Sequence, residues 1–510
     1  MVIFRKIQKF IQAINYIFFL DYYHRFFRKN IKTISRKSKK IILFNATEDL
    51  KSLFFGYSLA LEKKYSDCEF IFYLPLLSYY RVNYNKNFIL FVIFFYYKNL
   101  LLFFRNLKWK NLYSNFGSVF LEFNNWNIFK EIFLLKKSEK ILAHISSPED
   151  LKKLRYKSIL VGDLIYDTYL RYNNTYEFDM KNFFLVEILA KIIFRYEKLN
   201  KTLTRFDIKE FYTNQLGYAH HGLALRFFKK NKKNVQNFMW MSGPYHSKIS
   251  SYFYPYNFKK YPKIFKKLKN KDKLINEAAA LLKKKFSGEI ISQENYMPYS
   301  VYSKKGNNRL PKIKGIIFLH CFVDTPISKG KLIFQDHYHW VVETLKFLEH
   351  SKLTEGIAIK THPDSKEASL ECVNNLKKIF PNFLWLDSSV SNAEIFKTKP
   401  AFGVSAAGTV LYELAYHKIL PISAGEHPSM AYNFVLTPKN KLQYFKFLNR
   451  AINTKIKMNY DHKKILEFVY CNYIHDTSDP NLIAKKIDLK DWDYKSNNVI
   501  INFHKELKRC

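Results

Sequence analysis

The C-terminal half of the chain alternates between two hydrophobic patterns. Short, continuous apolar runs predict buried strands, and stretches in which apolar residues recur every three or four positions predict amphipathic helices. The predicted strands are 314–319, 356–360, 383–386, 401–405 and 419–423, and the predicted helices are 336–350, 365–379 and 408–416. Such regular alternation is typical of a parallel sheet with helices on its faces.

The first half of the chain shows the same alternation less regularly. Its predicted strands are 41–44, 69–74, 119–123, 140–143 and 158–161, with a helix at 50–63. Residues 178–240 are predicted to be mainly helical, notably over 185–199 and 223–228. We therefore expect an α/β protein in which two doubly wound, Rossmann-like domains face each other across a cleft.

Changes in composition suggest the boundaries between these parts. A stretch rich in Asn, Tyr, Ser and Pro is typical of a linker, and it separates a Lys-rich region from the regular C-terminal half. The predicted division is a basic, aromatic helical extension (1–39), an N-terminal Rossmann-like domain with a helical Lys-rich insert (40–289), the linker (290–312), a C-terminal Rossmann-like domain (313–438) and helices that close the fold (439–510).

The charge of the chain is strongly positive. Lys and Arg number 84 against 43 Asp and Glu, which gives a net charge of +41. This balance indicates an anionic partner, which can be nucleic acid, an acidic membrane surface or a phosphate-bearing substrate. The apolar fraction of 48% excludes a disordered chain, and 14 Gly and 15 Pro exclude a collagen-like one. An AT-rich genome encodes a similar composition, so charge alone does not choose a partner.

The cysteines and the apolar runs suggest the cellular location. Five scattered cysteines without paired spacing favour a reducing cytosol. Residues 1–40 carry eleven Lys or Arg and one acid among aromatics, which fits an interfacial membrane helix or a basic helix packed on its own domain. The runs 88–97 and 100–104 are separated by Lys98 and are too short to span a bilayer, so they predict a buried or membrane-facing helix. We expect a cytoplasmic protein, peripheral on the inner face of the cytoplasmic membrane.

Candidate phosphate-binding groups follow two of the predicted C-terminal strands. Ser405 ends one strand, and small residues that include Gly408 lead to a helix near Thr409. Small residues let backbone N–H groups at a helix start approach a phosphate, and the two hydroxyls add donors. One turn further, Glu413 can accept hydrogen bonds from a sugar or ribose. Lys360 and His362 stand at the end of another strand, where they supply charge and an imidazole donor.

Candidates for proton transfer and acceptor binding are more scattered. Asp324, which follows the strand 314–319 after His320 and Cys321, and the pair Asp163 and Asp167 are candidate general bases. For the pair, a helix N-cap and an exposed helix acid are the alternative. His220, His221 and Arg226 are candidate contacts to an anionic acceptor. The sequence 336–339, Asp-His-Tyr-His, hints at a metal, but histidines two apart on a helix point to different faces, and we expect no metal site.

These motifs together resemble a known family. Lys360-Thr361-His362-Pro363 at one strand end and the Ser405-x-x-Gly408-Thr409 run, followed by Glu, Pro and Gly, resemble GT-B glycosyltransferases of bacterial surface polysaccharide assembly. The likeness is to capsule-type Kdo transferases, polysialyltransferases and CDP-glycerol glycerophosphotransferases, and it covers about residues 314–435. It implies that His362, Ser405 and Thr409 bind the donor phosphate and that Glu413 contacts the ribose or sugar. The acidic motif that carries the base in these families is not clearly present.

The resemblance implies sugar transfer, without a metal, from a nucleotide-activated donor to a growing glycan or lipid-linked glycan. No cofactor is expected beyond the nucleotide-sugar co-substrate, whether linked to CMP or UDP. The alternatives are a CDP-glycerol- or ribitol-type polyol-phosphate transferase and, more remotely, a non-catalytic nucleic-acid-binding protein. No recognised nucleic-acid-binding motif occurs in the sequence, so nucleic acid is not the expected partner.

Overall fold

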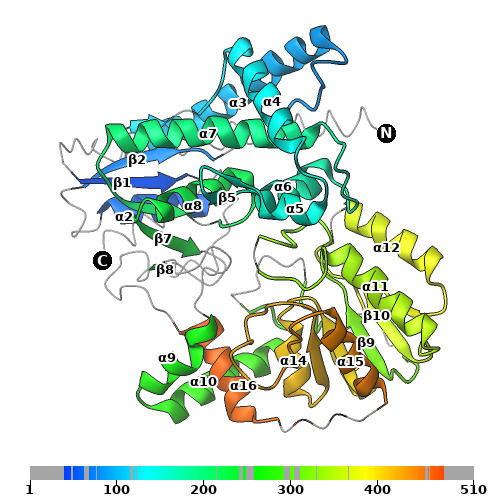
Figure 1. Cartoon of the computed structure of the whole chain (residues 1–510). Helices are drawn as coiled ribbons and strands as arrows, with labels where there is room; N and C mark the ends of the chain where they lie inside the picture. The colour runs from blue at the N-terminus through cyan, green and yellow to red at the C-terminus, as the bar shows by residue number, and fades with distance from the viewer. Residues whose placement is uncertain are drawn as a thin grey trace.

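The computed structural model describes residues 40–475, except 47–49, 62–67, 76, 78, 115–118, 122, 214, 240–244, 249–257, 292–298, 304–309, 329, 366, 454–455, 457 and 459. Two sheets form its framework (Figure 1). The predicted extension 1–39, much of the predicted linker 290–312 and the final 35 residues of the predicted closing helices lie outside the described residues.

The first sheet has six strands in the order β3-β2-β1-β6-β7-β8, and every pairing is parallel except that of β7 with β8. The strands are β1 (Lys40–Asn45), β2 (Cys68–Tyr73), β3 (Val119–Leu121), β6 (Ile208–Thr213), β7 (Asn234–Met239) and β8 (Tyr245–Lys248). The prediction of mainly helical structure over 178–240 was wrong at β6 and β7. Their sequences, IKEFYT and NVQNFM, mix polar with apolar residues and give no continuous apolar run.

Of two further strand predictions, the one at 140–143 was wrong, and the one at 158–161 is confirmed as a short strand outside the large sheet. Residues 140–142 form the last turn of α4 (Ile128–Leu142), whose first turn is capped by the Asn127 side chain. The run 158–161 contributes β5 (Ile159–Leu160), which pairs only with β4 (Arg155–Tyr156) in a small antiparallel hairpin. Both residues of its turn, Lys157 and Ser158, have positive φ, as a tight two-residue hairpin turn requires.

Helices cover the first sheet and, with it, form the first unit. They are α2 (Leu50–Leu61), α3 (Phe88–Tyr113), α4, α5 (Pro148–Lys153), α6 (Gly162–Asn173), α7 (Phe184–Arg205), the π-helix η2 (Tyr218–Gly222) and α8 (Leu223–Lys230). Leu43, Ile71 and Phe211 of the sheet and Ile188 of α7 are completely buried in one hydrophobic core. The predicted helices at 50–63, 185–199 and 223–228 are therefore confirmed.

Helix α3 is longer than the sequence analysis suggested. It runs unbroken through Lys98 for 26 residues, so the interpretation of two short apolar runs was wrong. A lysine lowers the mean hydropathy of an apolar run, but its helix propensity is good and it does not interrupt a helix. In the described part of the chain, α3 is the one helix whose length and apolar character would suffice to cross a bilayer.

The second sheet is fully parallel, in the order β11-β10-β9-β12-β13. Its strands are β9 (Gly315–Phe318), β10 (Ile357–Lys360), β11 (Leu384–Leu386), β12 (Phe402–Ser405) and β13 (Leu420–Ser423). Its helices, which with it form the second unit, are α11 (His337–His350), α12 (Glu367–Ile379), α13 (Asn392–Lys397), α14 (Val410–Tyr416), α15 (Lys441–Ile452), α16 (His462–Val469) and the π-helix η5 (Tyr470–Ile474). The five strands and three helices predicted for this part of the chain are confirmed.

Part of the Lys-rich insert packs on the second unit and not on the first, where the sequence analysis placed it. The segment contains the short 3-10 helix η3 (Phe258–Lys260), α9 (Tyr261–Lys267) and α10 (Lys271–Phe286). Its apolar face, with Ala278 and Leu282 fully buried, joins Leu411 of α14 and Ile465 of α16 in one hydrophobic cluster. The lysines remain on the outer side of these helices, apart from the buried Lys285.

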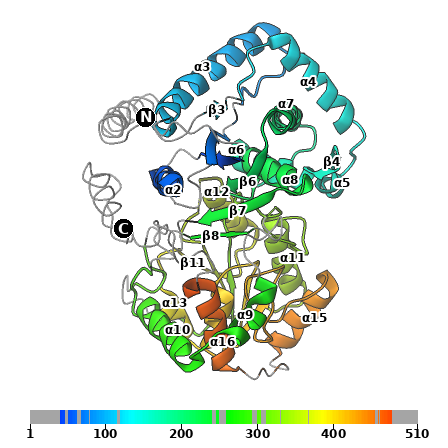
Figure 2. The same cartoon turned by 90° about the vertical axis from the view of Figure 1, so that its left-hand side faces the viewer.

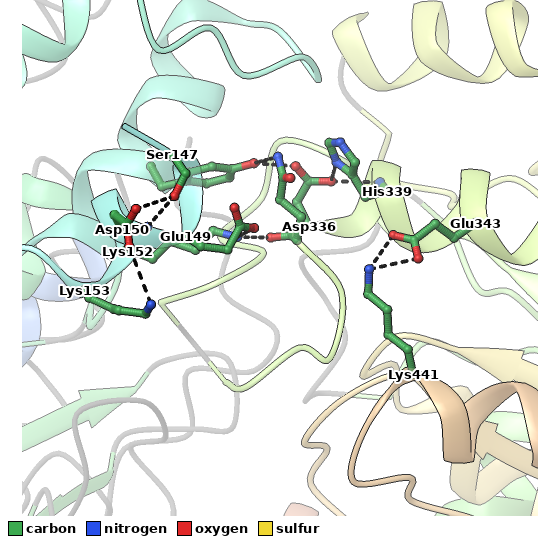
Figure 3. A network of polar contacts seen from close by, with 11 residues as sticks. Ser147, Glu149, Asp150, Lys152, Lys153, Asp336, His339, Glu343 and Lys441 are labelled. Carbon is green, nitrogen blue, oxygen red and sulfur yellow. Dashed lines mark hydrogen bonds and ion pairs between the residues drawn. The ribbon is translucent and has the colours of Figure 1, made fainter. Parts of the chain in front are cut away.

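Hydrogen bonds join the two units at the loop between β9 and α11. The Tyr166 hydroxyl on α6 donates to Asp336, and the Lys152 ammonium on α5 donates to the backbone carbonyl of Gln335. Asp336 also accepts the backbone N–H of His339 and so caps α11. Figure 3 shows Lys152 on one side of this junction and Asp336 on the other. The end of this loop, where it leads into α11, is therefore held by helices of the first unit.

Candidate functional site

The carboxyl ends of the second sheet form an aligned row of residues. Lys360 and Ser405 each pair in register with Phe318, so the last residues of β10, β9 and β12 lie side by side. Neighbouring strands are about 4.8 Å apart, which places the Cα atoms of Lys360 and Ser405 roughly 10 Å from each other. Ser423 continues the row on β13. The structure thus brings together predicted phosphate-binding residues that are distant in the sequence.

Three histidines stack beside this row. The ring of His320, which follows β9, lies 4.6 Å from that of His337 and 5.5 Å from that of His362, with interplanar angles of 20° and 22°. Burial lowers the pKa of His337 well below its usual value, and His320 lowers it further. Its Nδ1 is buried and has no hydrogen-bond partner among the described residues. A neutral imidazole such as that of His337 offers an N–H donor to an oxyanion without the cost of burying charge.

This stack does not have the form of a metal site. Near-parallel rings do not direct their nitrogens to a common point, as ligands around one ion must. Across the residues that the structure describes, no group of His, Cys, Asp or Glu is arranged to hold a metal ion.

The protonation of the His362 ring follows from a local hydrogen bond. The backbone N–H of Asp364 donates to its Nδ1 over 3.1 Å. A neutral imidazole that accepts at Nδ1 carries its proton on Nε2, so the other edge of the ring is a donor. The turn at Pro363, which ends β10, therefore sets His362 in the tautomer that can donate to a phosphate oxygen.

Lys360 is a buried cation at the same strand end. Its side chain is 2% exposed, and its ammonium donates to the carbonyl of Ser388 over 3.2 Å. Burial lowers its pKa to about 8, although Asp387 and Glu413 partly oppose the shift. An ammonium has three donor hydrogens, so this one retains capacity for a further acceptor.

The lowered pKa of Lys360 predicts a pH dependence for anion binding. We expect the affinity for a nucleoside diphosphate to be steady below pH 7 and to fall as the pH rises through 8, by at most about tenfold per pH unit, because the free protein loses the ammonium charge. Calorimetric titration from pH 6.5 to 9.5 measures this. The variant Lys360→Met should bind more weakly and with a nearly flat profile. An equally steep fall in that variant would assign the dependence to another group.

The turn after β12 is compact. A Cβ on Gly408 would stand 2.8 Å from the Ser405 Oγ, so glycine permits the close approach of this turn to the end of the strand. Thr409 is exposed at the start of α14 and makes no side-chain capping bond. Ser405 is buried at the row itself. The structure thus leaves a hydroxyl and small residues next to Lys360 and the histidine stack.

Glu413 does not stand open toward a ligand, contrary to the expected ribose contact. It is 2% exposed, forms an ion pair with Lys285 of α10 at 2.7 Å, and accepts the Tyr302 hydroxyl at 2.6 Å. Its two carboxylate oxygens are thus occupied by the protein's own donors. We correct the interpretation: Glu413 fastens α14 to the preceding part of the chain.

Asp163 and Arg226, predicted as a base and as an acceptor contact, bind each other. Two hydrogen bonds of 2.6 and 2.7 Å join the guanidinium to the carboxylate, and both residues are buried. Arg226 also donates to the carbonyl of Leu160, which fixes α8 against the β4–β5 hairpin. The pair is structural in position, so neither predicted role fits it.

The carboxylate of Asp167 is likewise occupied by hydrogen bonds within the protein. Its two oxygens accept the backbone N–H groups of Ile327 and Ser328, at 3.1 and 2.7 Å. Burial raises its pKa to about 7, although the hydrogen bonds from Ser328 and Ile327 lower it. It therefore joins α6 to the loop after β9, and it is not the exposed helix acid of the alternative interpretation.

Asp324 is the one of the three predicted carboxylates that stays partly exposed at this junction. It accepts the Tyr218 hydroxyl over 2.7 Å, and it is near enough to His337 to raise the pKa of that ring against the effect of burial. Tyr218 belongs to η2, which follows β6. The bond therefore joins the chain after a strand end of the first sheet to the chain after β9.

His220 and His221 lie on η2 at the carboxyl ends of the first sheet, but as buried neutral rings. Burial lowers the pKa of both, to about 3 for His221, whose Nδ1 accepts from the Asn45 side chain. His220 is stacked on Tyr218 and hydrogen-bonds Tyr172. They cannot act as cations toward an anionic acceptor, although His220 borders the Tyr218–Asp324 contact.

Sequence reasoning missed His337 and Tyr218. The histidine was considered only as a metal ligand, and its partner His320 was noticed only for its place after a strand. For Tyr218 the available signal was the glycine before it. A Cβ on Gly217 would come within 2.8 Å of the Thr325 side chain, so this position brings η2 close to the loop after β9.

The chain has few detectable relatives. It matches no protein-family model and no curated protein. Among solved structures it aligns with a proposed UDP-N-acetylglucosamine 2-epimerase from Listeria monocytogenes at 9% identity and a TM-score of 0.24, over 86% of this chain and 92% of that one. It also aligns with the wall teichoic acid polymerase TagF at 11% identity and a TM-score of 0.22, over 99% and 98%. TM-scores this low do not assign a function to the chain.

Proposed function

We propose that the chain is a transferase that takes a sugar from a nucleotide-activated donor and adds it to a hydroxyl of a growing surface glycan or lipid-linked glycan. The observation that supports this proposal is that Lys360 and His362 at the end of β10 and Ser405 at the end of β12 flank the end of β9, beside the stacked His320 and His337. A lysine, imidazole N–H groups, a serine hydroxyl and small residues are the groups that stabilise a phosphate leaving group.

The proposed chemistry separates two roles. The strand-end groups bind the donor phosphates and stabilise the charge that grows on them as the bond from sugar to phosphate breaks. Asp324, partly exposed and hydrogen-bonded to Tyr218, is the candidate base that accepts the proton of the attacking hydroxyl. We propose that Lys360 and the imidazole N–H groups stabilise the phosphate charge and that no step requires a metal.

A nucleotide screen tests the proposal. We expect one of CMP, CDP, UDP and GDP to raise the melting temperature, because a ligand at a hundred times its Kd stabilises the folded state by about 2.7 kcal/mol. The nucleotide that binds then names the donors to assay. If CDP binds and CDP-glycerol is the active donor, the protein is instead a polyol-phosphate transferase. The absence of a shift with all four nucleotides would contradict the proposed donor site.

A further inference from the structure

Helix α3 presents a bare apolar face at the end of the molecule. Its inner face is buried: Phe91 and Phe95 belong to the hydrophobic core of the first unit, and Trp109 is 1% exposed. Its outer face carries large hydrophobic side chains that recur every three or four residues, and each is more than a third exposed: Phe88, Ile89, Ile93, Tyr96, Tyr97, Leu100, Leu101, Phe104 and Leu107. An ordinary surface helix is polar on its outer side. This helix is apolar on both faces, and the residues that the structure describes cover only one.

The neighbouring helix extends the same surface. Phe129 and Phe133 of α4 are 80% and 63% exposed, and Trp126, just before α4, contacts Phe103 of α3. We call these residues and the outer face of α3 the α3–α4 face. Figures 1 and 2 show α3 and α4 on the side of the first sheet that is turned away from the second. An apolar surface of this extent on a folded chain marks an interaction site.

The charge around the face selects its partner. Helix α3 contains no Asp or Glu, and its basic residues include Lys98, Arg105 and Lys110. A second copy of the chain, docked by the same face around a two-fold axis, would bring these cations against one another. An anionic lipid surface instead complements them, and exposed Tyr and Trp beside Lys and Arg are typical of side chains at a bilayer interface.

The geometry decides how the helix would meet a bilayer. Phe91 and Phe95 pack edge-on against Tyr80 inside the core, so moving α3 across the membrane would take these buried side chains out of the core. At 1.5 Å per residue, the helix is about 39 Å long and can lie in the interfacial plane along its whole length. We infer that the α3–α4 face docks the protein on an anionic bilayer, with α3 parallel to its surface.

Vesicle sedimentation with the full chain tests this inference. The variant Ile89→Ser/Ile93→Ser/Phe129→Ser removes three side chains that are each more than half exposed. The matched control, Leu370→Ser/Ile379→Ser/Leu442→Ser, removes exposed apolar side chains from α12 and α15 of the second unit. We expect wild type and control to bind phosphatidylcholine vesicles that contain phosphatidylglycerol. The face variant should bind these vesicles at least about tenfold more weakly. Pure phosphatidylcholine and high salt should weaken wild-type binding.

Three outcomes would overturn the inference. They are equal vesicle binding by the face variant and wild type, no vesicle binding by wild type, and a dimer that the face variant converts to monomers without any vesicle binding. The last assigns the face to a second copy of the chain. Equal melting temperatures for the two triple variants exclude unfolding as the cause of a loss. Nucleotide binding should be the same in all three proteins, so this test and that of the donor site fail independently.

Discussion

Replacing His362 with alanine should lower transfer activity roughly 100- to 1000-fold, the loss that follows removal of one preorganised donor to a developing oxyanion. The Asp364 N–H fixes the ring with its proton on Nε2. The substitution therefore removes an oriented Nε2–H donor as well as the bulk of the ring. Initial rates with the donor that the nucleotide screen identifies measure the effect. His362→Gln should retain part of the activity, because its amide N–H can replace the Nε2 donor.

A matched histidine controls for nonspecific effects. His350 lies exposed at the last turn of α11, where it contacts only the backbone carbonyl of Lys346 in the described structure. His350→Ala should keep wild-type rates. Activity of His362→Ala within a few-fold of wild type, at normal stability, would show that this ring does not touch the donor phosphate.

Breaking the buried ion pair of Asp163 and Arg226 should have a large effect on stability. Asp163→Ala leaves the Arg226 guanidinium buried without its carboxylate, and we expect the free energy of unfolding to fall by about 3–5 kcal/mol. Chemical denaturation measures it. The exposed pair of Asp207 and Lys209 is the matched control, because Asp207→Ala removes a solvent-screened contact and should leave the unfolding free energy nearly unchanged.

The double variant Asp163→Leu/Arg226→Met separates the two possible roles of the pair. An apolar pair of similar size often replaces a buried ion pair without loss, so most of the stability should return. If Asp163 were instead the catalytic base, the restored fold would still be inactive. An Asp163→Ala protein as stable as wild type would contradict the structural role.

The sequence predicted the second sheet well because its strands are buried on both faces. Each of β9, β10, β12 and β13 consists entirely of buried residues, and such a strand reads as a continuous apolar run. Once these strands are located in the sequence, the residues at their carboxyl ends are located too, and these include Lys360, His362 and Ser405. Strands such as β6, in which Lys209 and Glu210 interrupt the apolar residues, give no such signal.

The pairings of buried charges were beyond prediction for a different reason. Glu413 meets Lys285, and Asp163 meets Arg226, across long stretches of chain that only the tertiary fold closes. A sequence shows which residues can carry charge but not whether a partner neutralises it. Candidate acids therefore outnumbered those that remain accessible, and the structure reduced three carboxylates to Asp324.

The ion pair between Lys285 and Glu413 governs how the protein can be divided for experiments. A cut within 290–312, where composition suggests a boundary, would leave the lysine on one fragment and the glutamate on the other, each in a place built to exclude water. It would also strip α9 and α10 from the hydrophobic cluster that they share with α14 and α16. A fragment that carries the second sheet should therefore begin before Phe258, so that it includes α9, α10 and Lys285, the ion-pair partner of Glu413.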